Sequence, residues 1–321
     1  MERKEKLPNV FYAMMLVLAL SLIALIGGAV CLLDYALKPA DLSRNDQKAW
    51  EEVYENYPGV KAWHDSLVSV GSLRDTTVTT LGYKMHAWFV PASRPTAATA
   101  LLLHGYTDCG ISMMPIARMY HRDMGMNVMI PDLTNSGRTE VDHYEMGKRE
   151  SEEARVWSYF ALREVGDSMR MVVHGVSMGA ATTMMTAGED TPEQVKVFVE
   201  DCGYTSVWDI FSSELKLRFG LPEFPILYTA SATARAKAGY GFKEASALQQ
   251  VQNCEKPMLF IHGTADDFIP YEMMGTLYNA KPGTNKATLT AEGAGHGEAM
   301  DVLGDTYWNT VFDFEGQYMA D

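Results

Sequence analysis

Hydrophobic and polar positions divide the chain into an apolar run near the N-terminus, a polar segment, and a region in which apolar and mixed stretches alternate. The first run is uncharged and mostly apolar from Val10 to Leu33 and ends at Asp34. Because an α-helix rises about 1.5 Å per residue, such a helix covers roughly 30 Å or more, the thickness of the hydrocarbon core of a bilayer. The pattern therefore predicts a membrane-spanning helix over 10–33, preceded by a short basic tail over 1–9.

A cleaved signal peptide is the alternative interpretation of this run. The apolar core of a signal peptide normally has about 7–15 residues and is followed by small residues, so the length favours an uncleaved single-pass anchor. A lipoprotein-type cleavage site is disfavoured because Val30 precedes Cys31 where a small residue would be expected. Basic residues flank the run on both sides, and we expect the tail inside the cytoplasm and the large C-terminal domain outside it.

The polar segment over 34–66 connects this run to the rest of the chain. Trp50, Tyr54 and Tyr57 recur in it at helical spacing, ahead of a Pro-Gly pair. Aromatic residues with this spacing usually form the buried face of a helix. We expect a connecting helical segment whose aromatic side chains pack on the following domain and bind no ligand.

The region over 67–321 has the order of predicted strands and helices that is typical of an α/β domain. Two β-rich runs around Thr76–Thr80 and Tyr83–Val90 predict a hairpin. Strand, loop and helix patterns then alternate, which indicates a mostly parallel central sheet with helices on both faces. Its strands are predicted near Ala98–Leu103, Asn127–Ile130, Met169–Val173, Val195–Val199, Met258–Ile261 and Ala287–Thr290.

A long insert, about 204–250, separates the fourth and fifth of these strands. Its periodic apolar residues predict cap helices. Two interpretations of these side chains stay open: they line a pocket for an acyl or apolar leaving group, or they only bury the cap on the sheet. The residues concerned are Phe211, Leu215, Phe219, Leu221, Phe224 and Leu227.

Composition narrows the classes of partner. The 321 residues are 47% hydrophobic and carry a formal net charge of −14. Since nucleic acids are held by basic surfaces, this charge excludes a nucleic-acid partner. The four cysteines show no zinc-ligand spacing, so we expect no metal site and free, buried thiols at Cys109, Cys202 and Cys254.

The stretch Met171–Ala181, MVVHGVSMGAA, carries the clearest chemical signal. It predicts an apolar strand, a Gly-x-Ser-x-Gly turn and a helix of small residues. In such a nucleophile elbow the serine, here Ser177, sits on a strained bend with a helix N-terminus behind it. Gly175 and Gly179 allow the close approach of strand and helix. The backbone N–H of Met178 would then face a developing oxyanion.

A second apolar strand ends in the segment HGYTDC. Gly105 permits a turn that aims the N–H of Tyr106 inward, where it could pair with that of Met178 as an oxyanion hole. We expect His104 to be a core histidine bonded to a loop carbonyl, because a His-Gly pair ahead of the elbow shapes the oxyanion loop.

Two later strand ends supply an acid and a histidine. Asp266 follows the strand at 258–261, and His296 lies among small residues after the last strand. The carboxyl ends of parallel strands meet at one edge of a sheet, the edge that would carry Ser177. Asp267 is expected to cap a helix that begins at Pro270. Asp201, at an earlier strand end, is the alternative acid.

The chain resembles the α/β-hydrolase fold superfamily in the segments HGYTDC, GVSMG, HGTADDFIP and GAGHGEA. Within it, the resemblance is to BEM46-type membrane-anchored hydrolases and to the catalytic domains of prolyl oligopeptidase-like peptidases, and it covers roughly Thr76 to the C-terminus. It implies that Ser177 is the nucleophile, His296 the general base and Asp266 the acid, in the chain order usual for this fold. It also implies oxyanion N–H groups from Tyr106 and Met178, with no metal or organic cofactor.

The chain departs from the family after the predicted strand at 127–130. Members often have a D-x-R-x-x-G-x-S segment there, whereas this chain has DLTNSGRT, without the arginine. We expect a membrane-anchored serine hydrolase that acts on small-molecule or lipid esters. A peptidase of the same chemistry is the alternative, although the stretch before Thr76 is too short for the propeller that prolyl oligopeptidases usually carry. A non-catalytic binding protein is the third possibility, which the retained serine, acid and histidine disfavour.

Overall fold

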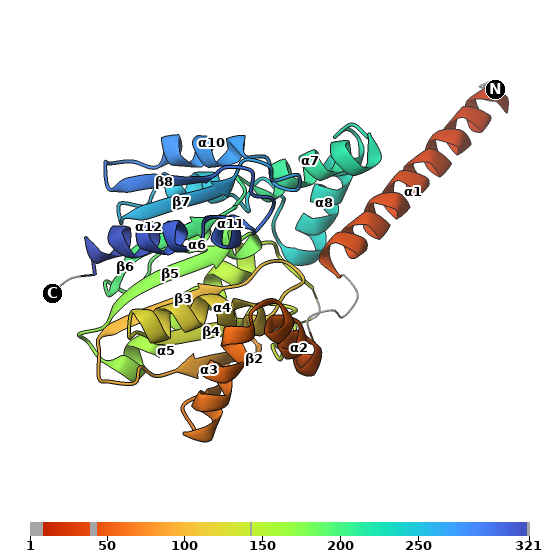
Figure 1. Cartoon of the computed structure of the whole chain (residues 1–321). Coiled ribbons are helices and arrows are strands. Elements are labelled where there is room, and N and C mark those ends of the chain that lie inside the picture. Colours follow the sequence, from red (N-terminus) through yellow and green to blue (C-terminus); the bar gives the residue numbers. More distant parts are fainter. Residues whose placement is uncertain (1–8, 39–43, 142, 320–321) are drawn as a thin grey trace.

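The computed structural model describes residues 9–38, 44–141 and 143–319 (Figure 1). Eight strands form one sheet in the order β1-β2-β4-β3-β5-β6-β7-β8. The strands are β1 (Arg74–Thr80), β2 (Tyr83–Val90), β3 (Ala98–Leu103), β4 (Asn127–Asp132), β5 (Arg170–Val176), β6 (Val195–Asp201), β7 (Met258–Gly263) and β8 (Lys286–Ala291). All pairs from β4 to β8 are parallel, and only the β1–β2 hairpin and its contact with β4 are antiparallel. The predicted α/β-hydrolase fold is confirmed.

Helices cover both faces of the sheet (Figure 1). They are α2 (Asp46–Asn56), α3 (Pro58–Ser69), α4 (Met114–Arg118), α5 (Lys148–Val165), α6 (Met178–Ala187), α9 (Ala247–Val251), α10 (Glu272–Ala280), α11 (Ala299–Leu303) and α12 (Asp305–Gly316). The central strands are buried on both sides, which explains why they appear in the sequence as continuous apolar runs. In β5, Met171 and Val173 face one core while Val172 faces the other.

The connecting segment forms two helices, α2 and α3, where one was expected. Pro58 opens α3 at a position where proline loses no helical hydrogen bond. The predicted packing of the aromatic side chains is confirmed for Trp50, whose ring lies 6.4 Å from that of Trp88 on β2.

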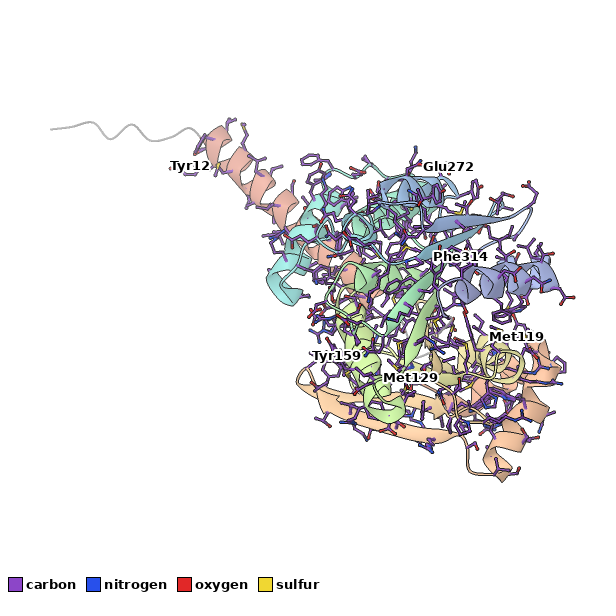
Figure 2. The ribbon with its side chains drawn as sticks, turned by 90° about the vertical axis from the view of Figure 1, so that its left-hand side faces the viewer. Tyr12, Met119, Met129, Tyr159, Glu272 and Phe314 are labelled. Carbon is purple, nitrogen blue, oxygen red and sulfur yellow. The ribbon has the colours of Figure 1, made fainter. Side chains whose placement is uncertain are left out.

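The apolar N-terminal run forms the 29-residue helix α1 (Asn9–Leu37), which continues four residues beyond the predicted end. Most of it projects from the domain, and Figure 2 shows Tyr12 standing clear of the other elements. Its last turns behave differently. Ala29, Leu33 and Leu37 are buried on one face, which packs against α8. The predicted basic tail over 1–9 lies, apart from Asn9, outside the described residues.

The insert between β6 and β7 carries the predicted cap helices, α7 (Val207–Phe219) and α8 (Ile226–Ala238). The side chain of Ser206 accepts a hydrogen bond from the backbone N–H of Asp209 and so begins α7. Gly220 and Gly239 end the two helices with left-handed backbones that favour glycine. The cap thus stands between the sheet edge and the end of α1 (Figure 1).

Candidate active site

Ser177 occupies a sharp turn between β5 and α6, with φ of 59° and ψ of −118°. A positive φ is strained for a residue other than glycine and is typical of a nucleophile elbow. The two flanking glycines make this turn possible. A Cβ atom on Gly175 would lie 2.1 Å from the carbonyl oxygen of Gly179, and one on Gly179 would lie 1.9 Å from that of Leu103. Neither position can accept a side chain.

The structure brings together the three side chains singled out from the sequence. Oγ of Ser177 lies 2.8 Å from Nε2 of His296. Nδ1 of the same imidazole lies 2.8 Å from Oδ2 of Asp266. With a proton on Nδ1, the carboxylate orients the ring and leaves Nε2 free to accept the proton of Ser177. This geometry can activate a hydroxyl as a nucleophile.

The carboxylate of Asp266 has further hydrogen-bond partners besides His296. Its Oδ1 accepts hydrogen bonds from the backbone N–H groups of Phe268 (2.9 Å) and Ile269 (2.8 Å). Nε2 of His262 lies 3.1 Å from its Oδ2. Burial by itself would raise the pKa of Asp266, but the hydrogen bonds from the two histidines outweigh it and leave the pKa well below its usual range. The carboxylate therefore stays ionised at neutral pH.

His262 is a site residue that was not predicted from the sequence. The signal was present, since a His-Gly pair ends β7 four residues before Asp266, as His104-Gly105 follows β3. Burial would lower the pKa of His262, but its hydrogen bond to Asp266 and the nearby charge of Glu200 raise it. The N–H at Nε2 of this imidazole is shared between the carbonyl of Ile269, at 3.0 Å, and the carboxylate that orients His296.

Asp201, the alternative acid, has a different partner. Its Oδ2 accepts a hydrogen bond from the hydroxyl of Tyr307 at 2.9 Å, and burial raises its pKa to about 6. Its backbone carbonyl accepts the N–H of Ser177 at 2.8 Å, so its part at the elbow is through the main chain. The structure therefore pairs His296 with Asp266.

The expected capping role of Asp267 is wrong. The N-cap residue of α10 is Tyr271, and no side chain caps this helix. Asp266 instead accepts the backbone N–H groups two and three residues after it. One carboxylate thus both orders the loop after β7 and orients the imidazole.

The residues predicted to stabilise an oxyanion lie at the same sheet edge. Met178 is the first residue of α6, and Tyr106 follows β3. Strand β3 pairs with β5 in a register that sets Leu103 beside Gly175. A Cβ on Gly105 would lie 3.5 Å from Cβ of Ser177, so the Tyr106 loop passes directly over the elbow.

His104 is a core residue, as expected. Its Nδ1 bonds the carbonyl of Gly105 at 2.8 Å, and its Nε2 accepts the N–H of Leu133 at 2.9 Å. Complete burial lowers its pKa and keeps it neutral. This histidine fixes the loop after β4 against the loop that carries Tyr106.

The loop that lacks the family arginine is organised around Asp132. This buried carboxylate accepts the N–H groups of Gly110 at 2.8 Å and Arg138 at 2.9 Å, and Nδ1 of His86 lies 2.7 Å from it. Gly137 has a positive φ, and a Cβ there would lie 2.2 Å from the carboxylate. The loop is therefore held by hydrogen bonds to an acid.

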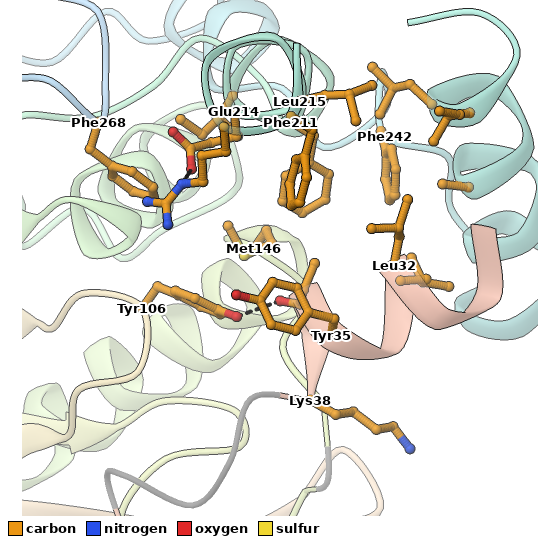
Figure 3. Close-up of a pocket in the computed structure, with 18 of the residues that line it drawn as sticks. Leu32, Tyr35, Lys38, Tyr106, Met146, Phe211, Glu214, Leu215, Phe242 and Phe268 are labelled. Atoms are coloured by element: carbon orange, nitrogen blue, oxygen red, sulfur yellow. Dashed lines mark hydrogen bonds and ion pairs between the residues drawn. The ribbon is translucent and has the colours of Figure 1, made fainter. Parts of the chain in front are cut away.

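An apolar pocket of about 520 Å³ opens beside the site, between the cap, the Tyr106 loop and the end of α1 (Figure 3). The ring of Phe268, which lines it, lies 5.0 Å from the ring of His296. Of the six apolar cap residues that could either line a pocket or only bury the cap, four line this pocket: Phe211, Leu215, Phe219 and Leu227. Leu221 and Phe224 do not line it and are exposed.

Among the described residues, Cys202, Asp266 and His296 are the group whose potential metal-ligand atoms lie within 4.8 Å of one another. Both oxygens of Asp266 and Nδ1 of His296 are already engaged in hydrogen bonds. Burial raises the pKa of the Cys202 thiol well above its ordinary value, and only the thiolate binds metal well. This donor set suits proton transfer better than a metal. Cys109, Cys202 and Cys254 are free and buried, as expected, and Cys31 is free and exposed.

Known proteins similar to this chain include a Bacillus subtilis protein, YqkD, which is 28% identical over 73% of this chain and 75% of its own. The Schizosaccharomyces pombe protein bem46 is 23% identical over 81% of this chain and 80% of its own. The Saccharomyces cerevisiae protein YNL320W, which is named as a membrane protein, is 23% identical over 74% of this chain and 78% of its own length.

Solved structures show the same fold. An esterase of Pyrococcus furiosus superposes with a TM-score of 0.62 at 20% identity, covering 77% of this chain and 92% of that one. An acylaminoacyl peptidase of Pyrococcus horikoshii superposes with a TM-score of 0.58 at 14% identity, covering 78% of this chain and 42% of that one. The family model for the prolyl oligopeptidase family matches residues 113–321. The chain is thus a hydrolase of the α/β-hydrolase superfamily and belongs to the prolyl oligopeptidase family.

Proposed function

We propose that the protein is a membrane-anchored serine hydrolase that cleaves carboxylic esters. The observation that carries this proposal is the hydrogen-bonded series Ser177, His296 and Asp266, with 2.8 Å between Oγ and Nε2 and 2.8 Å between Nδ1 and Oδ2. The apolar pocket beside it supports an ester with an apolar acyl group.

The acylation half-reaction begins at Ser177. Nε2 of His296 takes the hydroxyl proton while Oγ attacks the ester carbonyl carbon, and the carbonyl electrons move to oxygen. The N–H groups of Tyr106 and Met178 would stabilise this oxyanion. When the intermediate collapses, the bond to the alcohol oxygen breaks and the imidazolium returns its proton to the leaving alkoxide. An acyl ester on Ser177 remains.

Deacylation repeats these steps with water as the nucleophile. His296 takes a proton from water, the resulting oxygen attacks the acyl carbon, and Ser177 leaves as the hydroxyl when the proton is returned. Asp266 matters in both halves, because its lowered pKa keeps it anionic beside the imidazolium that forms. The products are an alcohol and a carboxylic acid.

The membrane anchor is part of the proposal. Residues 9–28 of α1 are almost all exposed and apolar, as a membrane-spanning segment would be. Burial of Ala29, Leu33 and Leu37 against the domain supports an uncleaved helix, since cleavage within the run would remove packed residues. We place the domain outside the cytoplasm. Resistance of the full-length protein to alkaline carbonate extraction tests the anchor, and protease accessibility in intact cells tests the orientation.

A serine peptidase is the second candidate, favoured by the family match and by the acylaminoacyl peptidase fold. It would use the same three side chains with an amide as substrate. Hydrolysis rates of p-nitrophenyl esters and of dipeptide amides, measured on the same preparation, separate the two activities. Faster turnover of the amides would replace the esterase assignment.

Covalent labelling tests the hydrolase itself. A short-chain fluorophosphonate should label Ser177 in the folded full-length protein, and Ser177→Ala should abolish both labelling and ester hydrolysis. If the folded wild-type protein is not labelled, both the esterase and the peptidase proposals fail, and the non-catalytic alternative stands.

A further inference from the structure

The end of α1 forms one wall of the pocket beside Ser177. We call this cavity the anchor pocket; its walls are the last turns of α1, the loop after β3, and helices α7 and α8. Leu32, Leu33, Tyr35 and Ala36 line it from α1, and Leu227 and Ala230 line it from α8. Figure 3 shows Leu32 opposite Phe242 at one end, and Phe268 at the other.

The other end of the anchor pocket reaches the candidate active site through Phe268, which contacts His296, and through the Tyr106 loop; Ser177 and His296 do not line the pocket themselves. The ring of Phe268 packs edge-on against that of His296, and Tyr106, whose N–H is the proposed oxyanion donor, lines the pocket. Arg218 forms an ion pair with Glu214 and lies 5.5 Å from the centre of the Phe268 ring. Charged groups thus gather near the site, while the α1 end is apolar apart from Lys38.

The α1 wall is fixed to the domain by specific bonds. The hydroxyl of Tyr106 donates to the carbonyl of Ala36 at 2.6 Å, and the N–H of Tyr144 donates to the carbonyl of Leu37 at 2.9 Å. These bonds satisfy carbonyls that a helix C-terminus leaves without partners. The residue that supplies a candidate oxyanion N–H therefore also holds the end of the anchor.

Helix length places this wall at the membrane surface. About 20 helical residues cross the hydrocarbon core of a bilayer, and α1 has 29. Residues 9–28 account for those 20 and are exposed, whereas the buried face begins at Ala29. The anchor pocket therefore starts where the hydrocarbon ends, with one wall continuous with the membrane-spanning surface.

We propose that the anchor pocket holds the acyl chain of a membrane lipid ester, which enters from the bilayer along α1 and presents its carbonyl carbon to Ser177. This inference rests on the proposed hydrolase function and names its substrate class. An apolar chain leaves the hydrocarbon and enters an apolar pocket without crossing water. The polar remainder of the lipid stays near Arg218 and Glu214.

Chain-length selectivity tests the occupant. In detergent, the full-length protein should hydrolyse p-nitrophenyl hexanoate with at least tenfold higher kcat/KM than the acetate, since each buried methylene can contribute up to about fourfold. Ala230→Trp should fill the pocket and reduce this hexanoate-to-acetate ratio about tenfold. The matched control is Ala236→Trp, at an exposed position of the same helix outside the pocket, which should leave the ratio unchanged.

A wild-type ratio near one, or equal ratios in wild type and Ala230→Trp, would overturn the acyl-chain assignment while leaving the esterase intact. Hydrolysis of neither ester, together with no fluorophosphonate labelling of Ser177, would instead remove the proposed function itself. The two failures are therefore distinguishable.

A second measurement uses only the wild-type protein, so it can be made even if Ala230→Trp does not fold. The full-length protein in phosphatidylcholine vesicles is treated with a hexadecyl fluorophosphonate that carries a diazirine at the chain end, and is then irradiated. Adducts on the peptides containing residues 29–37 of α1 or 226–238 of α8 are expected alongside the label on Ser177. Labelling of Ser177 with adducts only on other elements would refute the proposed path.

Discussion

Nε2 of His262 lies 3.1 Å from Oδ2 of Asp266, the same oxygen that accepts Nδ1 of His296 at 2.8 Å. The acid of the site is thus shared by two imidazoles, one fully buried and one facing Ser177. Glu200, whose pKa burial raises to about 8, interacts electrostatically with the inner imidazole. Orientation of His296 therefore depends on a group outside the three that the sequence singled out.

His262→Leu should lower kcat about tenfold, because one hydrogen bond to a charged acceptor contributes about 1.5 kcal/mol. The KM for a short ester should change little, since His262 does not line the anchor pocket. His262→Gln, which keeps a donor, should recover part of kcat. A positioning role would be contradicted if both variants lost activity equally or only KM changed.

Asp266→Asn should reduce kcat by about 10⁴-fold, because an amide cannot hold the imidazole in the required tautomer. Asp201→Asn should cost far less, since the side chain of Asp201 bonds Tyr307 and contributes to the elbow through its main chain. Turnover of a short ester by the two variants decides between the acids. An active Asp266→Asn enzyme would assign the acid elsewhere.

Gly179→Ala should sharply reduce both stability and labelling of Ser177. The added Cβ would lie 1.9 Å from the carbonyl oxygen of Leu103, so the backbone of β3 or α6 must move. Gly275→Ala is the matched control on α10, where a Cβ meets nothing within 4 Å. There alanine should stabilise the helix by about 0.5–1 kcal/mol. Thermal melting and fluorophosphonate labelling report the contrast, and equal melting temperatures would contradict it.

Glu315→Gln should make stability less dependent on pH. Burial raises the pKa of Glu315 from 4.5 to about 8, and its Oε1 accepts the hydroxyl of Tyr120 at 2.5 Å. Folding therefore favours the protonated form. The stability it contributes is complete below about pH 4.5 and is lost as pH rises to about 8.

Glutamine retains an acceptor for Tyr120 and cannot ionise. The melting temperature of Glu315→Gln relative to wild type should rise steadily from pH 5 to pH 8, with a free-energy difference on the order of a few kcal/mol at most. Other buried carboxyl groups titrate in both proteins and cancel in the comparison. A difference that stays constant over this range would contradict the raised pKa.

Local sequence predicted the sheet and the elbow well because both depend on short-range constraints. Strands buried on both faces must be apolar along their whole length, and β3 begins and ends at the predicted residues. The elbow requires glycine where β3, β5 and α6 meet, which leaves a readable pattern. Chain order then indicated which acid and histidine would join Ser177.

Other features depend on contacts between distant segments, which the sequence could not supply. In the sequence, His262 looks like any histidine at the end of a strand. Only the fold of β7 and the loop after it shows that its side chain lies beside Asp266. The final turns of α1 are as apolar as the rest of the helix, and only the folded cap shows that Leu33 and Leu37 face the domain. Asp267 does not cap α10, because the loop after β7 is instead held by hydrogen bonds from its backbone N–H groups to the side chain of Asp266.

The hydrogen bonds from Tyr106 and Tyr144 fix the last turn of α1 to the domain. A long flexible tether would let an enzyme reach solutes or a facing vesicle, whereas under the proposed membrane anchor this junction would hold the mouth of the cavity close to the leaflet that contains α1. Turnover on a lipid ester should then follow its mole fraction within that leaflet and fall on dilution with inert lipid, even when the bulk amount is held constant.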